Sequence, residues 1–116
     1  KYCFGDDSSQ LKDYAWYGRL FKGTKPVGQK KPNAWGLYDL HGNVWEWCAD
    51  DWHNNYQEAP SDGSIWLGSN KNKVLRGGSW YYDALRCCCA CRGRGARVDR
   101  GIDQGFRVAS GFHRVT

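Results

Sequence analysis

The sequence predicts a loop-rich α+β domain built on short antiparallel strands. Helical periodicity is nearly absent, because Gly, Asn, Asp and Ser interrupt every stretch longer than about ten residues. Aromatic residues make up 16% of the chain, and seven Trp, seven Tyr and four Phe provide more burial energy than a disordered chain needs. The 116 residues are therefore expected to form a single domain, residues 1–116, that is either minimal or truncated.

Composition also bears on location and partners. No run of about 18 apolar residues could span a membrane, and the start of the chain lacks the basic and apolar regions of a signal peptide. The sequence leaves open whether a leader was removed and whether the protein belongs to a phage particle, a cell surface or the cytoplasm. It also leaves the oligomeric state open. The net charge of +5 does not by itself indicate nucleic acid.

The chain opens with an aromatic segment, residues 1–21, which contains the run DYAWYGRLF. Three of its rings are expected to cover a core, namely Tyr14, Trp16 and Tyr17. A polar connector, which contains two of the three prolines, follows over residues 22–36.

Three strands are predicted farther along the chain. The alternating run VWEW at residues 44–47 predicts a strand with one aromatic face. VLRGGSW at residues 74–80 is typical of a strand that ends in a glycine turn, and GFRVASG at residues 105–111 predicts another strand. Residues 53–72 are rich in turn-forming residues, so we expect an exposed loop there.

The tryptophans allow two interpretations. Five of them could form an aromatic platform for a sugar or could pack in the core: Trp35, Trp45, Trp47, Trp66 and Trp80. We expect core packing, because a domain this small has few other large apolar groups. The Glu-Pro-Asn and Gln-Pro-Asp tripeptides of carbohydrate-reading lectins do not occur in the sequence.

Three motifs, NAWGLYDLHGNVWEWCADDW, VLRGGSW and GFRVA, resemble in order and spacing the C-terminal half of the formylglycine-generating enzyme (sulfatase-modifying factor) family. The resemblance extends weakly upstream through DYAWYG and PVGQKKPNAWG, and the family's N-terminal half has no counterpart here. It implies a variant of the C-type lectin fold, which is irregular and short of secondary structure. The matching positions are Trp35, Gly36, Leu37, Tyr38, Asp39, Gly42, Asn43, Val44, Trp45, Glu46, Trp47, Arg76, Gly77, Gly78, Ser79, Gly105, Phe106 and Arg107.

The resemblance implies a structural Ca²⁺ site. In the family, such an ion is held by side chains at the positions of Asp39 and Glu46 and by main-chain oxygens at those of Gly42 and Val44. A hard cation prefers oxygen ligands, and a glycine-bearing turn between two carboxylates lets carbonyl groups point inward. The alternative is that Asp39 caps a turn and Glu46 pairs with an arginine.

Catalysis is the second property that the family implies. Its enzymes use two cysteines five residues apart to bind copper and to activate oxygen for oxidising a substrate cysteine. Counting back from Gly105, these positions fall on Ala84 and Cys89, so the pair is broken. No two cysteines of the CCCAC cluster at residues 87–91 are five apart, and adjacent thiols do not easily converge on one tetrahedral ion.

Residues 81–103 have an unusual composition. They contain no Lys, Glu, Gln, Met or Trp, whereas the preceding 80 residues contain eight Lys, seven Trp, three Gln and two Glu. These absent residue types are the ones that no codon ending in C encodes, and an AAC codon randomised at its adenines gives the observed set. Residues 81–107 also concentrate charge, with six Arg against three Asp.

With this composition, the chain resembles the variable proteins of diversity-generating retroelements, which use the same scaffold. In that group a reverse transcriptase introduces adenine errors into the 3′ end of the gene, and the altered codons encode surface residues that bind ligand. The resemblance implies a variable binding segment at residues 81–103 and explains the clustered cysteines as products of randomisation. The candidate variable residues are Tyr81, Tyr82, Asp83, Arg86, Cys88, Cys91, Gly93, Gly95, Val98, Gly101, Ile102 and Asp103.

A binding face of this kind needs a rigid scaffold beneath side chains that do not contribute to the core. Tyr and Arg are good anchors, because they add contact area or bidentate hydrogen bonds at limited entropic cost. Five residues of the segment are expected to belong to the scaffold, with guanidinium groups beneath the loop. They are Cys87, Ala90, Arg92, Arg94 and Arg100.

We therefore expect a non-catalytic protein that binds an unknown protein or cell-surface ligand. The alternative is a copper-dependent cysteine oxidase of the formylglycine-generating type. A third interpretation takes RGRGAR at residues 92–97 as a nucleic-acid contact. We do not favour it, because folded arginines near a GFR motif are often structural.

Overall fold

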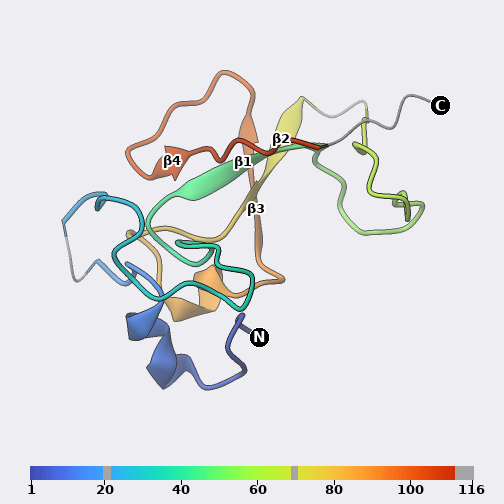
Figure 1. Ribbon diagram of the computed structural model, residues 1–116. Coiled ribbons are helices and arrows are strands. Elements are labelled where there is room, and N and C mark those ends of the chain that lie inside the picture. Colours follow the sequence, from blue (N-terminus) through green and yellow to red (C-terminus); the bar gives the residue numbers. More distant parts are fainter. Residues whose placement is uncertain (20–21, 69–70, 112–116) are drawn as a thin grey trace.

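The computed structural model describes residues 1–19, 22–68 and 71–111. Within these residues, four strands form one curled sheet in the order β3-β2-β1-β4 (Figure 1). The β1–β2 and β2–β3 pairs are antiparallel, as predicted, but β1 and β4 are parallel, so the sheet is mixed. The strands are β1 (Trp45–Asp51), β2 (Asn72–Arg76), β3 (Arg92–Ala96) and β4 (Gln104–Gly105).

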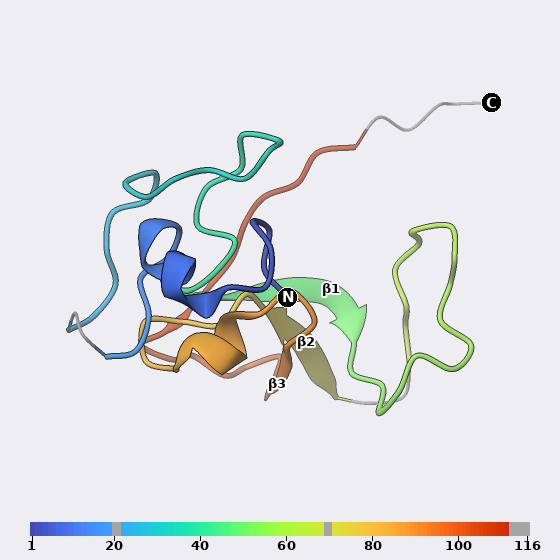
Figure 2. The same ribbon diagram turned by 90° about the horizontal axis from the view of Figure 1, so that it is seen from below.

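The helical content consists of two short 3-10 helices, η1 (Ser8–Asp13) and η2 (Ala84–Cys87), and the described residues form no α-helix. The carboxylates of Asp7 and Asp83 cap them by accepting backbone N–H bonds. In Figures 1 and 2 the two helices lie close together at one end of the molecule, and the loop over residues 53–68 projects at the other. In the described part of the chain, no helix is long and apolar enough to cross a membrane.

The aromatic face predicted for residues 44–47 is present on β1. Trp45 is buried and Trp47, two residues farther along, is half-buried. Strand β3 places glycines against both rings, since a Cβ atom on Gly93 would lie 3.5 Å from the Trp45 ring and one on Gly95 would lie 2.7 Å from the Trp47 ring. Gly95 therefore makes room for the Trp47 ring, whereas a side-chain carbon at Gly93 would be in ordinary contact with Trp45.

The glycine turn predicted after β2 is confirmed. Gly77 and Gly78 have φ angles of +94° and +71°, in the left-handed region that favours glycine. A Cβ atom on Gly78 would also lie 2.7 Å from the sulfur of Cys87. This turn therefore carries the chain from the sheet to η2 at a close approach that only glycine permits.

One cluster of buried side chains comes from the N-terminal segment and from η2. Its members are Tyr2, Leu11, Ala15 and Cys87. Phe4 and Tyr17 pack against this cluster, and the Tyr14 ring stacks on Phe4 with centroids 4.5 Å apart. Trp16 is half-buried as well, so the prediction that the aromatic segment covers the core is confirmed.

The core prediction for the tryptophans is wrong for Trp35, which is 84% exposed. The Asn33 side chain accepts hydrogen bonds from the backbone N–H groups of Trp35 and Leu37, and this tight turn places the indole on the surface. Of the other four, Trp45 is buried, and the remaining three are half-buried.

The strand predicted at residues 105–111 is also wrong beyond its first residue. Strand β4 ends at Gly105, and Phe106 is 76% exposed. Beyond the strand, the Arg107 side chain binds the Glu46 carboxylate. The loop predicted over residues 53–72 is largely exposed as expected, although residues 69–70 lie outside the described residues.

Candidate functional site

The segment from residue 81 to residue 103 leaves the glycine turn and is fixed to the N-terminal part of the chain by its backbone. The Gly18 N–H donates to the Tyr82 carbonyl (2.7 Å), and the Arg19 N–H donates to the Trp80 carbonyl (2.8 Å). The Arg19 Nε atom also donates to the Tyr81 carbonyl at 3.1 Å. Since these bonds use main-chain oxygens, they hold the segment whatever side chains it carries.

The two tyrosines at the start of the segment form an exposed aromatic group. Tyr81 and Tyr82 are 38% and 39% exposed, and their rings meet edge to face with centroids 5.6 Å apart. The Arg19 guanidinium lies 3.7 Å from the centre of the Tyr81 ring, and Tyr82 meets the buried Trp45 at 5.8 Å. Large rings are thus presented at the surface on a fixed base.

Helix η2 separates scaffold from surface within the segment. Cys87 is fully buried, and burial raises the pKa of its thiol to about 12, so this thiol is chemically inert. Asp83 and Arg86 are exposed at the opposite face, although the Asp83 carboxylate also accepts the Arg86 N–H as the helix cap.

Four of the twelve candidate variable residues line one cavity of about 210 Å³: Tyr82, Arg86, Gly93 and Asp103. Trp45 and Leu75 from the sheet lie beneath them, and Arg94 and Gln104 complete the lining. The Gln104 Oε1 atom is buried without a hydrogen-bond partner. We refer to this space as the small cavity.

The other candidates are placed differently. Val98, Gly101 and Ile102 are exposed, beyond the end of β3. Gly95 is buried against Trp47, and a side chain there would collide with the ring. Asp103 is tied to the scaffold, because the Ser79 hydroxyl donates to its carboxylate at 2.7 Å. The segment therefore combines free surface positions with positions that hold the fold.

Two arginines that were expected to belong to the scaffold differ in their surroundings. The Arg92 guanidinium lies 4.5 Å from the ring centres of both Trp52 and Tyr56 and donates to the His53 carbonyl. It therefore belongs to the scaffold, as predicted, but it fixes the loop after β1 to the sheet and does not lie beneath the segment at residues 81–103. Arg94 is exposed, although its guanidinium approaches the Trp52 ring at 5.5 Å.

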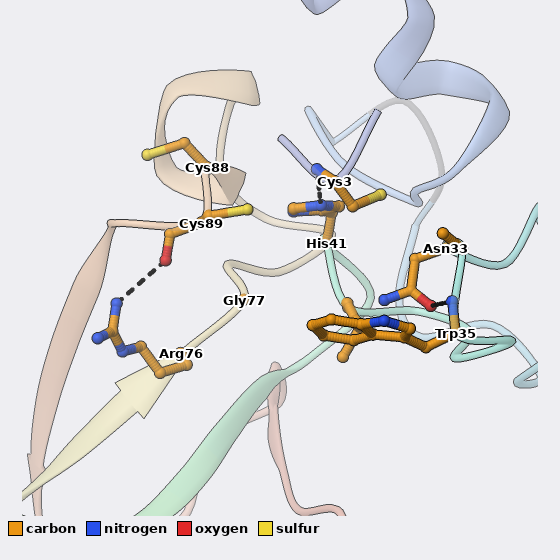
Figure 3. A pocket seen from close by; sticks show the side chains of 10 residues that line it. Cys3, Asn33, Trp35, His41, Arg76, Gly77, Cys88 and Cys89 are labelled. Atoms are coloured by element: carbon orange, nitrogen blue, oxygen red, sulfur yellow. Dashed lines mark hydrogen bonds between the residues drawn. The ribbon is translucent and has the colours of Figure 1, made fainter. Parts of the chain in front are cut away.

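A larger cavity of about 510 Å³ opens on the other side of the segment (Figure 3). Cys3, Cys88 and Cys89 line it together with the His41 ring and the exposed Trp35. Sequence reasoning did not associate these residues, because they come from four separate stretches of the chain. We refer to this space as the large cavity.

His41 holds the wall of the large cavity in place. The Cys3 N–H donates to its Nε2 atom (3.1 Å), and Nδ1 lies 2.7 Å from the Cys87 carbonyl. A nitrogen that accepts a bond carries no proton, so Nδ1 is the protonated nitrogen that donates to Cys87. Burial lowers the pKa of His41, and a neutral imidazole therefore links the N-terminal segment to η2.

Three of the four residues predicted to bind Ca²⁺, Asp39, Val44 and Glu46, line a third cavity of about 370 Å³, and Gly42 is not part of its lining. The Asp39 Oδ2 atom accepts the Gly28 N–H at 2.8 Å, whereas Oδ1 is buried without a partner. Gly42 has a φ of +74°, and a Cβ atom there would strike the Trp16 carbonyl. The backbone between the two carboxylates thus requires glycine.

Glu46 is not free at this site. Both of its carboxylate oxygens accept hydrogen bonds from Arg107, the shortest being 2.7 Å, and these bonds raise the pKa of Arg107. Arg107 also donates to the Tyr38 and Asp39 carbonyls. The ion pair that was considered as the alternative to calcium is therefore present, and the unpartnered Asp39 oxygen remains beside it.

The positions at which the enzymes carry paired cysteines are also located. Ala84 begins η2, and Cys89 lies in the exposed turn that follows η2. No three His, Cys, Asp or Glu side chains of the described ranges converge in a way that could hold a metal ion.

Comparison with known proteins relates this geometry to a family. The family model described as the sulfatase-modifying factor enzyme 1-like domain matches residues 4–111. The chain belongs to this family. Mouse formylglycine-generating enzyme is 34% identical to it over 93 residues, which cover 78% of this chain and 25% of the enzyme.

Two solved structures resemble this sulfatase-modifying factor enzyme 1-like domain closely. Variable protein 1 of Treponema denticola matches with a TM-score of 0.75 and 37% identity over 88% of this chain and 37% of that one. PvdO from Pseudomonas aeruginosa matches with a TM-score of 0.76 and 42% identity over 81% of this chain and 38% of that one. The resemblance to a variable protein on this scaffold is confirmed. The chain spans between about a quarter and two fifths of the length of these three relatives.

The motifs that identified the family meet in space. The Gly42 N–H donates to the Gly77 carbonyl at 2.7 Å, and the Trp80 N–H donates to the Asn43 carbonyl at 2.9 Å. Arg107 of the GFR motif binds Glu46 of the GNVWEW motif. The three motifs therefore form one connected scaffold for the segment at residues 81–103 in this sulfatase-modifying factor enzyme 1-like domain.

Proposed function

We propose that this chain is a non-catalytic ligand-binding protein with a C-type lectin-like fold, whose binding face at residues 81–103 is diversified by adenine-directed retroelement mutagenesis. The similarity to a variable protein of Treponema denticola supports this proposal. The ligand is a protein or a cell-surface molecule of unidentified kind.

The observation that carries the proposal is the small cavity. Its lining includes Tyr82, Arg86, Gly93 and Asp103, which belong to three separate parts of the segment. Binding sites in proteins are concave, with apolar walls and a few convergent polar groups. The apolar side chains of Trp45 and Leu75 and the charged groups of Arg86 and Asp103 meet that description.

The attachment of the segment also supports a variable face. The contacts from Gly18 and Arg19 reach main-chain carbonyls, so substitution of the exposed side chains leaves them in place. The buried Cys87 and the glycine turn supply the fixed part of the segment. The exposed side chains can therefore vary, while the main chain and the buried residues of the segment stabilise the fold.

Two display libraries test this separation. The first randomises five exposed positions, and the control library randomises five buried ones. The displayed proteins are scored for protease resistance and then selected against immobilised streptavidin as an arbitrary target. The exposed set is Tyr81, Tyr82, Arg86, Val98 and Ile102, and the buried set is Leu11, Val74, Leu75, Ser79 and Cys87.

We expect most members of the exposed library to resist protease and some to bind the target, whereas most members of the buried library are digested. Equal digestion of the two libraries would contradict the proposal, because the exposed side chains would then be part of the fold. A stable exposed library that yields no binder against several unrelated targets would contradict the binding role.

We propose further that Ca²⁺ stabilises the scaffold. The buried, unpartnered Asp39 Oδ1 atom supports a cation at this site. Side chains of Asp39 and Glu46 and main-chain oxygens of Gly42 and Val44 would hold it. The ion would supply only structural charge neutralisation, and Glu46 would share its carboxylate between the ion and Arg107.

A second candidate function is copper-dependent oxidation of a substrate cysteine. One observation favours it, since Cys89 is exposed and lines the large cavity beside Cys88 and Cys3. Oxygen consumption with a cysteine-containing peptide and Cu(I), lost on Cys89→Ser, would establish this activity. A chain that consumes no oxygen under these conditions would exclude it.

A further inference from the structure

The CCCAC cluster contains a turn that sequence reasoning left without a role. The Cys91 N–H donates to the Cys88 carbonyl at 3.1 Å, and Cys89 and Ala90 occupy the two central positions of this turn. The ends of a β-turn have Cα atoms less than about 7 Å apart, which is the separation that a disulfide spans. Cys88 and Cys91 thus stand at the two ends of a turn in a Cys-x-x-Cys arrangement.

The turn is held in this geometry by bonds on every side. The Cys89 N–H donates to the Lys1 carbonyl at 2.9 Å. The Arg76 Nη1 atom donates to the Cys89 carbonyl at 3.1 Å and to the Cys91 carbonyl at 3.3 Å. A disulfide between Cys88 and Cys91 would therefore form on a backbone that is already shaped for it, which lowers the entropic cost of closure.

The six cysteines are free thiols in the structure, and their surroundings differ. Cys87 is fully buried, and burial raises the pKa of its thiol to about 12. Cys88 and Cys91 are half-buried, and the thiol of Cys91 is near that of Cys88, which contributes to the raised pKa of Cys91 after burial itself. The guanidinium groups of Arg86 and Arg76 act on Cys91 in the opposite direction.

Cys88 and Cys91 are both half-buried, so neither thiol is closed off from small molecules in solution. Cys88 also belongs to the lining of the large cavity, although in Figure 3 the Cys89 side chain points into the cavity and the Cys88 side chain points away from it. The serine variants of Cys88 and Cys91 distinguish which of the two thiols reacts first.

We propose that Cys88 and Cys91 form a redox-active dithiol that exchanges with low-molecular-weight disulfides. In the first step the Cys88 thiolate attacks one sulfur of the external disulfide, forms a mixed disulfide and releases one thiol. The Cys91 thiolate then attacks the Cys88 sulfur, closes the Cys88–Cys91 disulfide and releases the second thiol. Two protein thiols are oxidised, and one external disulfide is reduced to two thiols.

The dithiol lies within the proposed binding face at residues 81–103, but no cysteine lines the small cavity, and its test counts thiols and does not measure ligand binding. Its failure would leave the binding proposal intact, and the reverse also holds. When it closes, the disulfide fixes the turn that leads directly into β3.

The experiment uses the full chain, reduced and then incubated with oxidised glutathione under native conditions. Remaining thiols are alkylated after denaturation and counted by mass spectrometry. Trypsin cleavage after Arg86 and Arg92 gives a peptide, residues 87–92, that carries four of the six cysteines. The Cys89→Ser variant is the cleanest background, because it leaves Cys88, Cys91 and the inert Cys87 in this peptide.

In the wild type and in Cys89→Ser, we expect the peptide to lose two alkylatable thiols with no glutathione attached. Adding Cys91→Ser to Cys89→Ser should stop the reaction at a mixed disulfide with glutathione, and adding Cys88→Ser should prevent closure. The Cys48→Ser variant, altered in β1 and outside the turn, is the matched control and should react as the wild type does.

Three results would overturn the proposal. The peptide could retain all its thiols in the wild type, it could carry only glutathione adducts, or its thiols could be bridged to Cys3 or Cys48. Loss of folding on closure, read from the thermal midpoint of the oxidised protein, would also contradict a turn that is already shaped for the disulfide.

Discussion

The two glycines of β3 that face tryptophans should respond in opposite ways to the same substitution. A Cβ atom on Gly93 would lie between 3.4 and 3.6 Å from Leu75 and Trp45, which is ordinary contact, whereas one on Gly95 would lie 2.7 Å from the Trp47 ring. Gly93→Ala should therefore raise the free energy of unfolding by about 0.5 kcal/mol through the reduced entropy of the unfolded chain. Gly95→Ala should lower it by about 1–3 kcal/mol through overpacking.

Thermal and urea unfolding, followed by circular dichroism, measure the difference. For a domain of this size, roughly 4 °C of thermal midpoint corresponds to 1 kcal/mol, so Gly95→Ala should melt roughly 4–12 °C lower than the wild type. Gly93→Ala is the matched control on the same strand and face. Equal midpoints for the two variants would refute the reasoning, because they would mean that the Trp47 ring gives way without cost and that Gly95 is as free to vary as Gly93.

Three other predictions concern Asp51, His41 and the proposed Ca²⁺ site. The Lys73 ammonium, with Arg97, holds the pKa of the Asp51 carboxyl at about 2 instead of 3.8. The stabilisation that ionised Asp51 gives the fold is therefore complete above pH 3.8 and is lost as the pH falls towards 2. Urea unfolding of the Asp51→Asn variant should lack this acid dependence. Burial lowers the pKa of His41 from 6.5, so the free energy of unfolding should fall as the pH drops below that value, and a His41→Gln variant with an unchanged slope there would contradict this. Ca²⁺ should raise the thermal midpoint of the wild type but not that of Asp39→Asn, and an unresponsive wild type would refute the calcium proposal.

The sequence predicted the parts of the fold that depend on strong local patterns. The alternation of residue types around Trp45 predicted β1, and the paired glycines after Arg76 predicted the turn that follows β2. Strand β3 was not predicted, because the sequence RGRGA has glycine, and no apolar side chain, on the strand face that lies against the tryptophan rings. The apolar contacts of this face come from the rings of Trp45 and Trp47 on β1, and they can be recognised only once the strands are paired.

The candidate site was predicted only in part for a similar reason. Counting along motifs located the residues around Asp39, but it did not reveal that Arg107 returns from the end of the chain to bind Glu46. The large cavity is lined by Cys3, His41 and Cys88, which are far apart in the sequence, so no local sequence pattern could have predicted it. Within residues 81–103, composition indicated variability, whereas burial decides which positions tolerate it.

The central claim, a diversified binding face, is tested most directly by sequencing the DNA that flanks this gene. The account predicts a near-copy of the gene's 3′ end beside a reverse transcriptase gene, differing from it only where the copy has adenine. The differing codons should fall on exposed positions such as Tyr81, Arg86 and Ile102 and should spare Gly78 and Cys87. Flanking DNA without such a copy, or a copy that differs at the buried positions, would contradict the account.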